Sequence, residues 1–143
     1  MNEEMIDRLE KSFKLLAPRG PELVDRFYAH LFSRHPAVRP MFPDDMHEQK
    51  KKLLASLVLV IENIRAVEKL EKPLADMGRR HLGYGTKPEH YPVVRDTLVS
   101  VMADMAGDAW NDQLTDDWTG ALDFVASAML EGAKQAQQVA ETN

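Results

Sequence analysis

The chain has 143 residues, a length that suits one domain with one hydrophobic core. Hydrophobic residues make up 44% of it and charged residues 29%, and the net charge of −5 leaves no basic surface for binding nucleic acid. The absence of cysteine excludes disulfides and thiolate ligands, and no window approaches the roughly 20 apolar residues of a membrane span. We therefore expect a cytoplasmic protein with a single domain over residues 1–143, in which the polar tail 134–143 frays.

Helical periodicity runs through the chain, whereas strand signals are scarce. Apolar residues at a spacing of three or four predict a first helix over residues 6–16 and a second over 23–32. Pro21 is well placed to open the second helix, and Pro36 ends it because the residue before a proline tends to leave the α region. A short prolyl turn then runs to about Phe42.

The same pattern continues beyond the turn. Asp44 or Asp45 can cap a long helix that carries an apolar face over residues 53–64. Pro73 fits the first turn of the next helix, and Gly83 and Gly85 terminate it.

Two more helices complete the predicted set. Pro88 opens one that ends at Gly107, and Asp112 or Thr115 caps the last helix. The fold class is therefore all-α, with six or seven helices. Their uneven lengths and the prolyl corner favour steep pairwise packing around a pocket over an up-and-down bundle.

His81 is the most informative candidate for chemistry. It follows Leu74 and Met77 on one helix face, where a lone histidine is more often a hydrogen-bonded core residue than a ligand. No second set of histidine or cysteine residues completes a zinc tetrahedron. One imidazole in an apolar helical protein instead suggests an iron held by a porphyrin, with Tyr91 or Glu131 as a partner for the other ring nitrogen.

Three segments together resemble the globin family, in particular the globins of the bacterial flavohaemoglobins. The stretch from Phe27-Tyr28 through Pro36 to Met41-Phe42 is similar to their second helix and corner, and Gln49-Lys50-Lys51-Lys52-Leu53 to their distal helix. Arg80-His81 and the segment 87–92 are similar to their proximal side. The resemblance implies a globin-like fold with one haem b (iron protoporphyrin IX), whose iron His81 ligates.

The resemblance also implies roles for further residues. Tyr28 and Gln49 would donate hydrogen bonds to a bound diatomic ligand, and Tyr91 would act through the proximal network. The residues expected to contact the haem are Phe42, Leu53, Met77, His81, Thr86, Tyr91 and Val94. Each has a simpler interpretation, since Tyr28 can be a core residue, Gln49 a surface amide and Tyr91 an ordinary interhelical contact.

Four features depart from the family pattern. The segment between Phe42 and Gln49 is shorter than usual, and Thr86 stands where an aliphatic residue is typical. Glu131 falls about two residues early, over half a helical turn, so its place in the proximal network is open. The flavin- and NAD-binding modules of the flavohaemoglobins are not recognisable in this sequence.

The leading functional prediction is reversible binding of O2, and of NO and CO, by a haem protein that is a monomer or a homodimer. The alternative is an enzyme, a nitric oxide dioxygenase that depends on a separate flavin reductase. A haem-based gas or redox sensor ranks third, and a haem-free helical adaptor remains the simplest rival.

Overall fold

The computed structural model describes the backbone of residues 1–142 and the side chains of residues 1–139. This part of the chain forms six α-helices and four short 3-10 helices, with no β-strand. The α-helices are α1 (Glu3–Leu16), α2 (Gly20–Arg34), α3 (His47–Glu62), α4 (Glu71–Gly83), α5 (His90–Ala106) and α6 (Asp112–Thr142). The 3-10 helices are η1 (Ala17–Arg19), η2 (Pro36–Met41), η3 (Val67–Leu70) and η4 (Gly107–Ala109). The predicted all-α fold is confirmed.

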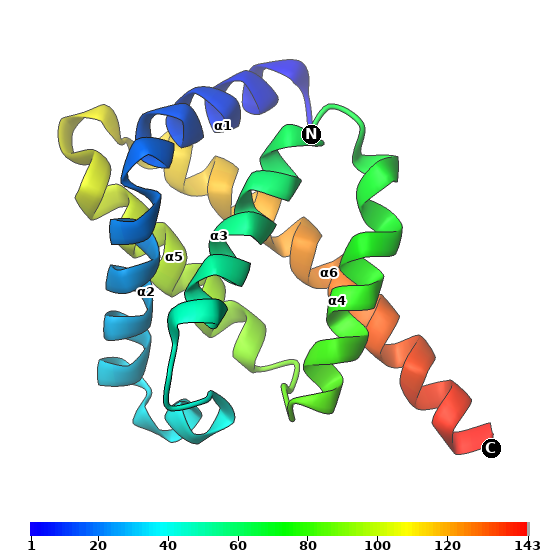
Figure 1. Ribbon diagram of the computed structural model, residues 1–143. Coiled ribbons are helices and arrows are strands. Elements are labelled where there is room, and N and C mark those ends of the chain that lie inside the picture. Colours follow the sequence, from blue (N-terminus) through cyan, green and yellow to red (C-terminus); the bar gives the residue numbers. More distant parts are fainter. Residues whose placement is uncertain (143) are drawn as a thin grey trace.

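The helices cross one another steeply and do not form a parallel bundle (Figure 1). In this view α3 and α4 stand next to each other at the front, α5 and α6 pass behind them, and α1 crosses the top. α2 packs on both α3 and α5, and α4 packs chiefly on α6. Of the predicted site residues, Gln49 and Leu53 lie on α3, and Met77 and His81 lie on α4, which stands beside α3 in this view.

Most helix ends lie where the sequence predicts them. Pro21 sits in the first turn of α2, and α2 ends at Arg34, just before the His35-Pro36 pair. The N-cap of α3 is Met46, so the prediction of Asp44 or Asp45 as the cap was wrong by one residue. The Asp45 side chain still accepts a hydrogen bond from the backbone N–H of His47 at 3.0 Å and so satisfies a free amide at the start of α3. Gly107 ends α5 with a φ of 55°, in the left-handed region that favours glycine.

The start of α6 differs from the prediction. The Oδ1 atom of Asn111 accepts a hydrogen bond from the backbone N–H of Leu114 at 2.9 Å. Asn111 is therefore the residue that caps α6, and the prediction of Asp112 or Thr115 was wrong. Asparagine is as strong an N-cap as aspartate, so the sequence alone did not separate the neighbouring candidates.

The carboxyl-terminal segment also differs from the prediction. Residues from Lys134 onward, expected to fray, continue α6 as far as Thr142. Alanine, glutamine and lysine have high intrinsic helix propensity, and a long helix already nucleated by packing extends through such residues at little cost. Asn143 lies outside the described residues.

The hydrophobic core draws on all six α-helices and on the connection before α4. Its largest fully buried side chains are Trp118, Phe27, Leu9, Leu16, Leu23, Ile64, Leu70, Leu74, Met102 and Val101. Burying a side chain of this kind contributes about 1.5–3 kcal/mol. The core thus holds the steep helix crossings in place.

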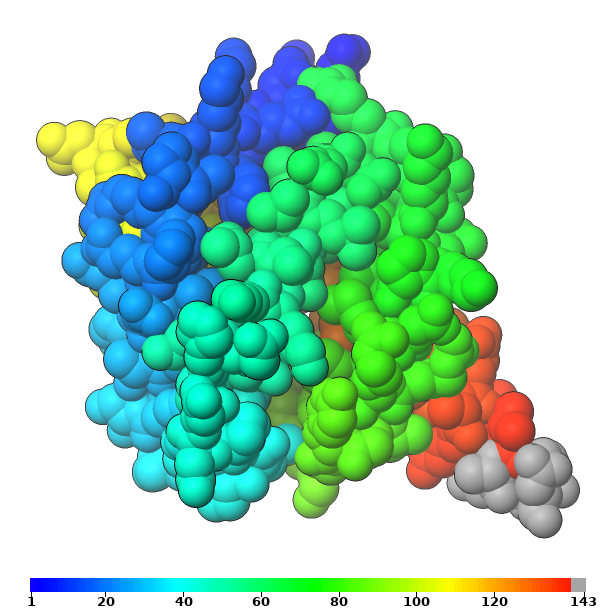
Figure 2. All heavy atoms as spheres, viewed as in Figure 1, coloured from blue at the N-terminus to red at the C-terminus, as the bar shows by residue number. Residues whose placement is uncertain are grey.

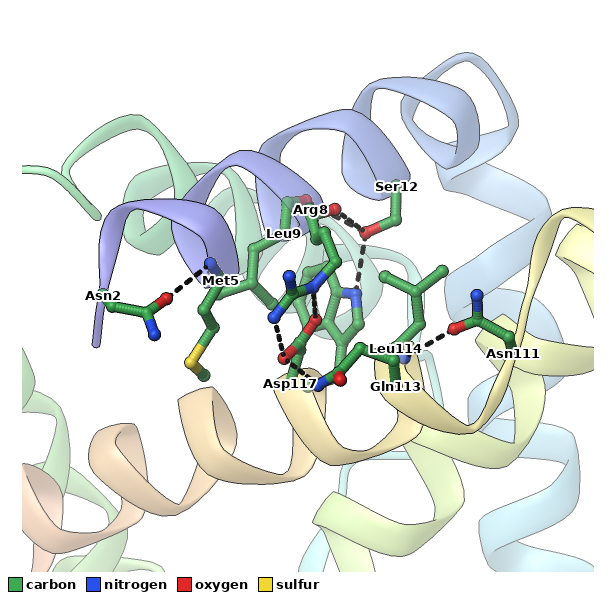
Figure 3. A network of polar contacts seen from close by, with 10 residues as sticks. Asn2, Met5, Arg8, Leu9, Ser12, Asn111, Gln113, Leu114 and Asp117 are labelled. Atoms are coloured by element: carbon green, nitrogen blue, oxygen red, sulfur yellow. Dashed lines mark hydrogen bonds and ion pairs between the residues drawn. The ribbon is translucent and has the colours of Figure 1, made fainter.

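A polar network fixes α1 against α6 (Figure 3). The carboxylate of Asp117 is 3% exposed and accepts hydrogen bonds from Arg8 Nε at 2.6 Å and from Gln113 Nε2 at 3.0 Å. The indole of Trp118 donates to Ser12 Oγ at 2.9 Å, and that hydroxyl donates to the Arg8 carbonyl at 2.8 Å. Among the described side chains, no buried polar atom lacks a hydrogen-bond partner.

Two glycines bring α4 and α6 into backbone contact. A Cβ atom on Gly78 of α4 would overlap the carbonyl group of Met129, and one on Gly132 of α6 would overlap the backbone of Ala75. Both glycines are buried. Only a residue without a side chain allows the two helix axes to come this close. The position of α4 is therefore set directly by α6.

No helix in the described part of the chain is both long enough and apolar enough to cross a membrane.

Candidate functional site

His81 lies near the end of α4 with a fixed ring orientation. Its Nδ1 atom lies 2.7 Å from the carbonyl oxygen of Met77, one turn earlier in the helix. A carbonyl oxygen only accepts, so Nδ1 carries the proton and the lone pair is on Nε2. Nε2 makes no hydrogen bond to any described residue. A tautomer fixed by a backbone carbonyl is the arrangement typical of a metal-ligating histidine.

The loop after α4 turns back over His81. The backbone N–H of Thr86 donates to the carbonyl of His81 at 3.0 Å, and Gly85 has a φ of 84°, which permits the reversal. The ring of Tyr84 packs against the imidazole, with centroids 5.8 Å apart and planes at 62°. Tyr84 is nevertheless 57% exposed, so the same phenol touches both His81 and solvent.

Tyr28 and Gln49 meet where α2 approaches α3. The Gln49 amide Nε2 donates to the phenol oxygen of Tyr28 at 3.3 Å, which joins α2 to the first turn of α3. Tyr28 is 4% exposed. Burial raises the pKa of its phenol, and the hydrogen bond from Gln49 opposes that shift only in part. Tyr28 is therefore a protonated phenol whose oxygen already accepts one hydrogen bond.

Aromatic rings surround Tyr28. Phe42 makes an edge contact with Tyr28 at a centroid distance of 5.6 Å and another with Phe32 at 5.3 Å. Phe27 stands at 4.9 Å from Tyr28 on its other side. Edge-to-face pairs of this kind contribute about 0.5–1.5 kcal/mol beyond their buried area. The cluster fixes the phenol, and Phe42 itself remains partly exposed.

The surface is recessed between α3, which carries Gln49 and Leu53, and α4, which carries Met77 and His81, and the orange of α6 is visible there (Figure 2). Leu53, Met77 and Val94, predicted to contact a cofactor, are partly buried and pack against the edge of the core. Thr86 is also partly buried. The sequence prediction thus selected apolar side chains that are neither fully buried nor fully exposed.

Some of the predicted site residues make no hydrogen bond to the others among the described residues. Tyr91 is partly buried in the first turn of α5, and burial raises its pKa. Among the described residues its hydroxyl forms no hydrogen bond to His81 or to Glu131. Glu131 is exposed on α6, and His47 is exposed at the start of α3. A proximal network through Tyr91 and Glu131 remains a prediction.

Three residues close to the site were not singled out from the sequence. Gly78 and Gly132 set the spacing of α4 and α6, and Tyr84 contacts His81. A signal existed for each of them. A glycine inside a helical pattern indicates close backbone approach, and a residue three positions after His81 shares its side of the helix.

A protein-only metal site is not part of this arrangement. The described residues include no group of three or more histidine, cysteine, aspartate or glutamate side chains able to hold a metal ion. A separate groove of about 460 Å³ runs along α3 and is lined by Lys51, Leu54, Ala55, Val58, Leu59 and Glu62. None of the predicted site residues lines it. The candidate site therefore comprises a single imidazole on α4 and a tyrosine–glutamine pair on α2 and α3.

The family model named Globin matches residues 25–129, which is most of the chain and includes both sides of this site. The chain belongs to the globin family. A globin-like protein of Aquifex aeolicus is 28% identical over 130 residues, which cover 91% of this globin and 92% of that protein.

Longer relatives match as well. A flavohemoprotein of Halalkalibacterium halodurans is 24% identical over 143 residues, which cover 98% of this globin and 35% of that protein. This globin spans about a third of the length of the flavohemoproteins it matches. Among solved structures, an engineered carbene transferase from Rhodothermus marinus, described as a proposed nitric oxide dioxygenase, superposes with a TM-score of 0.89 at 23% identity. The superposition covers 99% of each chain and shows a shared fold.

Members of the globin family hold a haem, and the residues of this chain fit one. His81 offers an oriented Nε2 lone pair with no protein partner among the described residues. The partly buried apolar side chains at the edge of the core would be covered by a flat apolar group. Tyr28 and Gln49 supply the polar contact that such a pocket otherwise lacks.

Proposed function

We propose that this globin reversibly binds O2, and also NO and CO, at a b-type haem (iron protoporphyrin IX) ligated by His81. One observation carries the proposal. The phenol oxygen of Tyr28 accepts a hydrogen bond from Gln49 at 3.3 Å, and no described residue accepts the phenol's own proton. That proton is available to a ligand in the pocket.

When bound, a haem iron supplies the open coordination position for a diatomic ligand and shifts electron density onto it. Tyr28 donates to that partial negative charge, and Gln49 acts by fixing the orientation of the phenol. A hydrogen bond to a charged group contributes about 1.5–3 kcal/mol, which corresponds to a change in O2 affinity of roughly 10- to 100-fold. Carbon monoxide takes less charge and gains less.

The apolar residues have the complementary task of excluding water. Leu53 on α3 and Phe42 after η2 place hydrocarbon beside the tyrosine–glutamine pair. A dry pocket strengthens the hydrogen bond from Tyr28 and hinders hydration of a partly anionic ligand. The hydrogen bond from Nδ1 of His81 to the Met77 carbonyl fixes the imidazole ring and leaves Nε2 as the nitrogen that would ligate a haem iron.

Measurement of O2 release by stopped flow tests the proposal. Purified protein is expected to show a Soret absorption band that His81→Ala lacks. Tyr28→Phe keeps the ring and its aromatic contacts and removes only the hydroxyl, and it should accelerate O2 release at least about tenfold, or 1.4 kcal/mol. Gln49→Leu should have a smaller effect, because it loosens the orientation of the phenol but leaves the donating hydroxyl present. An unchanged rate in Tyr28→Phe would reject the donor role, and a colourless protein that ignores added hemin would reject the haem.

A second function is supported by the flavohemoprotein relatives and by the tyrosine–glutamine pair. In nitric oxide dioxygenation, NO, O2 and one electron combine to give nitrate, NO3⁻. The electron requires a donor, and we propose a separate flavin reductase. With that reductase and NADH supplied, catalytic NO consumption over many turnovers would favour the enzyme. Consumption of one NO per haem would favour the O2 binder.

A further inference from the structure

Tyr84 is an oxidisable side chain in an unusual place. Its ring lies 5.8 Å from the His81 ring, centroid to centroid, in an edge contact at 62°, yet 57% of the residue is exposed. It is the C-cap of α4, three residues after His81. The proposed function makes no use of it. One face of the phenol is thus beside the candidate iron ligand and another is in water.

The other oxidisable residues are less suited to react with anything outside the protein. The sequence has three tyrosines and two tryptophans and no cysteine. Tyr28 and Trp118 are 4% and 1% exposed. Tyr91 and Trp110 are partly buried. Tyr84 is the only one of these five side chains that combines contact with His81 and wide exposure.

One-electron oxidation of a phenol also requires a place for its proton. The phenol oxygen of Tyr28 is buried and accepts a bond from the Gln49 amide, which cannot take a proton. Tyr84 can release its proton to water directly. Its neighbours Gly83 and Gly85 have open space where a side chain would begin, so a second molecule can approach the ring.

We propose that Tyr84 is an oxidative modification site at which oxidising equivalents from the haem pocket leave the protein when the oxidant is a peroxide. This inference rests on the proposed haem. Each of two Tyr84 phenols loses one electron and one proton, and the peroxide O–O bond is cleaved to form two molecules of water. The two phenoxyl rings then couple through a new carbon–carbon bond. The balance is H2O2 plus two tyrosines giving one dityrosine and two H2O, with the haem returned to its initial state.

The experiment uses haem-loaded full-length protein, verified by its Soret band, treated with one to a few equivalents of hydrogen peroxide. Covalent dimer is measured on denaturing gels, dityrosine by its fluorescence, and the cross-linked position by peptide mass spectrometry. We expect a dimer linked through Tyr84 in the wild type. Tyr84→Phe preserves the ring contact with His81 and should lower dimer yield at least about tenfold, a factor that would equal 1.4 kcal/mol in a rate.

A matched control separates the effect of contact with His81 from the effect of solvent exposure of the tyrosine. Leu15 on α1 is 52% exposed, close to the value for Tyr84, and has no contact with His81 among the described interactions. Adding Leu15→Tyr to Tyr84→Phe restores an exposed tyrosine away from the pocket. If the route depends on the contact with His81, this double variant stays as poor at cross-linking as Tyr84→Phe. Restoration to the wild-type yield would overturn the proposal.

Other outcomes of the same experiment also decide the matter. The inference is contradicted if haem-loaded wild type consumes peroxide while Tyr84 stays unmodified. It is also contradicted if the cross-links form through Tyr28 or Tyr91. Either result leaves the proposed function intact. Protein that takes up no haem contradicts both. Protein without haem, treated in the same way, should form no dityrosine, and equal cross-linking there would show that the pocket has no part in it.

Discussion

At the scale of single residues, the protonation state of Tyr28 decides what the pocket can do. The phenol is almost fully buried, and burial raises its pKa above the usual value of about 10. A phenolate would repel a partly negative ligand, whereas the protonated form donates to it. The ring contacts with Phe27 and Phe42 hold the phenol where Gln49 can reach it.

The raised pKa gives a prediction for pH dependence. Because the folded pKa of Tyr28 exceeds the unfolded one, the buried neutral phenol contributes stability below about pH 10, and that contribution is lost as pH rises through the folded pKa. Between about pH 6 and pH 9 the phenol stays protonated. The ratio of O2 release rates in Tyr28→Phe and wild type should therefore be constant across this range, as measured by stopped flow. A ratio that falls towards one near neutral pH would show that the phenol ionises early.

His81 was singled out as a lone imidazole on an apolar helix face, whereas Tyr28 and Gln49 were expected from the resemblance to the globins of flavohaemoglobins. The structure brings Tyr28 and Gln49 together. Whether the side chains of Tyr91 and Glu131 reach His81 depends on how α5 and α6 are rotated about their axes. A shift of two positions turns a helical side chain by over half a turn, and sequence spacing does not fix that angle across a long loop. No described hydrogen bond joins these two residues.

At the scale of helices, the crossing of α4 and α6 is the most demanding contact in the fold. Gly78 and Gly132 each face the backbone of the partner helix, with no space for a methyl group. A backbone carbonyl cannot rotate aside as a flexible side chain can. Helix separation is therefore the only response to a larger residue at either position.

Alanine substitutions test this contact. Gly78→Ala and Gly132→Ala should each lower the free energy of unfolding by about 1–3 kcal/mol through overpacking, and should weaken hemin retention because α4 carries His81. Gly120→Ala is the matched control in α6, since a Cβ there meets only Met5 Cε at 3.4 Å. That control should be neutral or stabilising by up to about 1 kcal/mol, because alanine favours the helix. Urea titrations measure all three, and equal effects at the three positions would refute the account.

Helix limits were largely predictable because local chemistry sets them. Prolines 21 and 36, Asp45 and Gly107 act within one or two residues of where they stand. The crossing of α4 and α6 was not predictable, because Gly78 and Gly132 are 54 positions apart and nothing local relates them. The extension of α6 to Thr142 was missed because polar composition was taken as a sign of fraying, although the same residues favour helix.

At the scale of the whole molecule, α6 links the amino-terminal helix to the site. Asp117 and Trp118 fix α1 to one part of α6, and Gly132 fixes α4 to another (Figure 3). Removing the buried carboxylate in Asp117→Ala should cost about 1–3 kcal/mol, because it deletes hydrogen bonds from Arg8 and Gln113. Asp116→Ala, at the neighbouring exposed position, should change stability by less than about 0.5 kcal/mol.

Thermal unfolding followed by circular dichroism measures the difference between these two variants. For a domain of this size, 1 kcal/mol corresponds to a shift in Tm of about 2–8 °C. If Asp117→Ala and Asp116→Ala melt together, the network in Figure 3 holds α1 no more firmly than an ordinary surface contact would.

The direct meeting of backbones between α4 and α6 has a mechanical consequence. No side chain lies between the two helices at this contact, so none can rearrange when one helix moves. A displacement of α6 at this point should therefore displace α4 as well. His81 is three residues after Gly78, less than one helical turn from the contact, whereas α6 continues from Gly132 to Thr142. A displacement of the carboxyl-terminal end of α6 is therefore expected to shift α4 and, with it, the imidazole of His81.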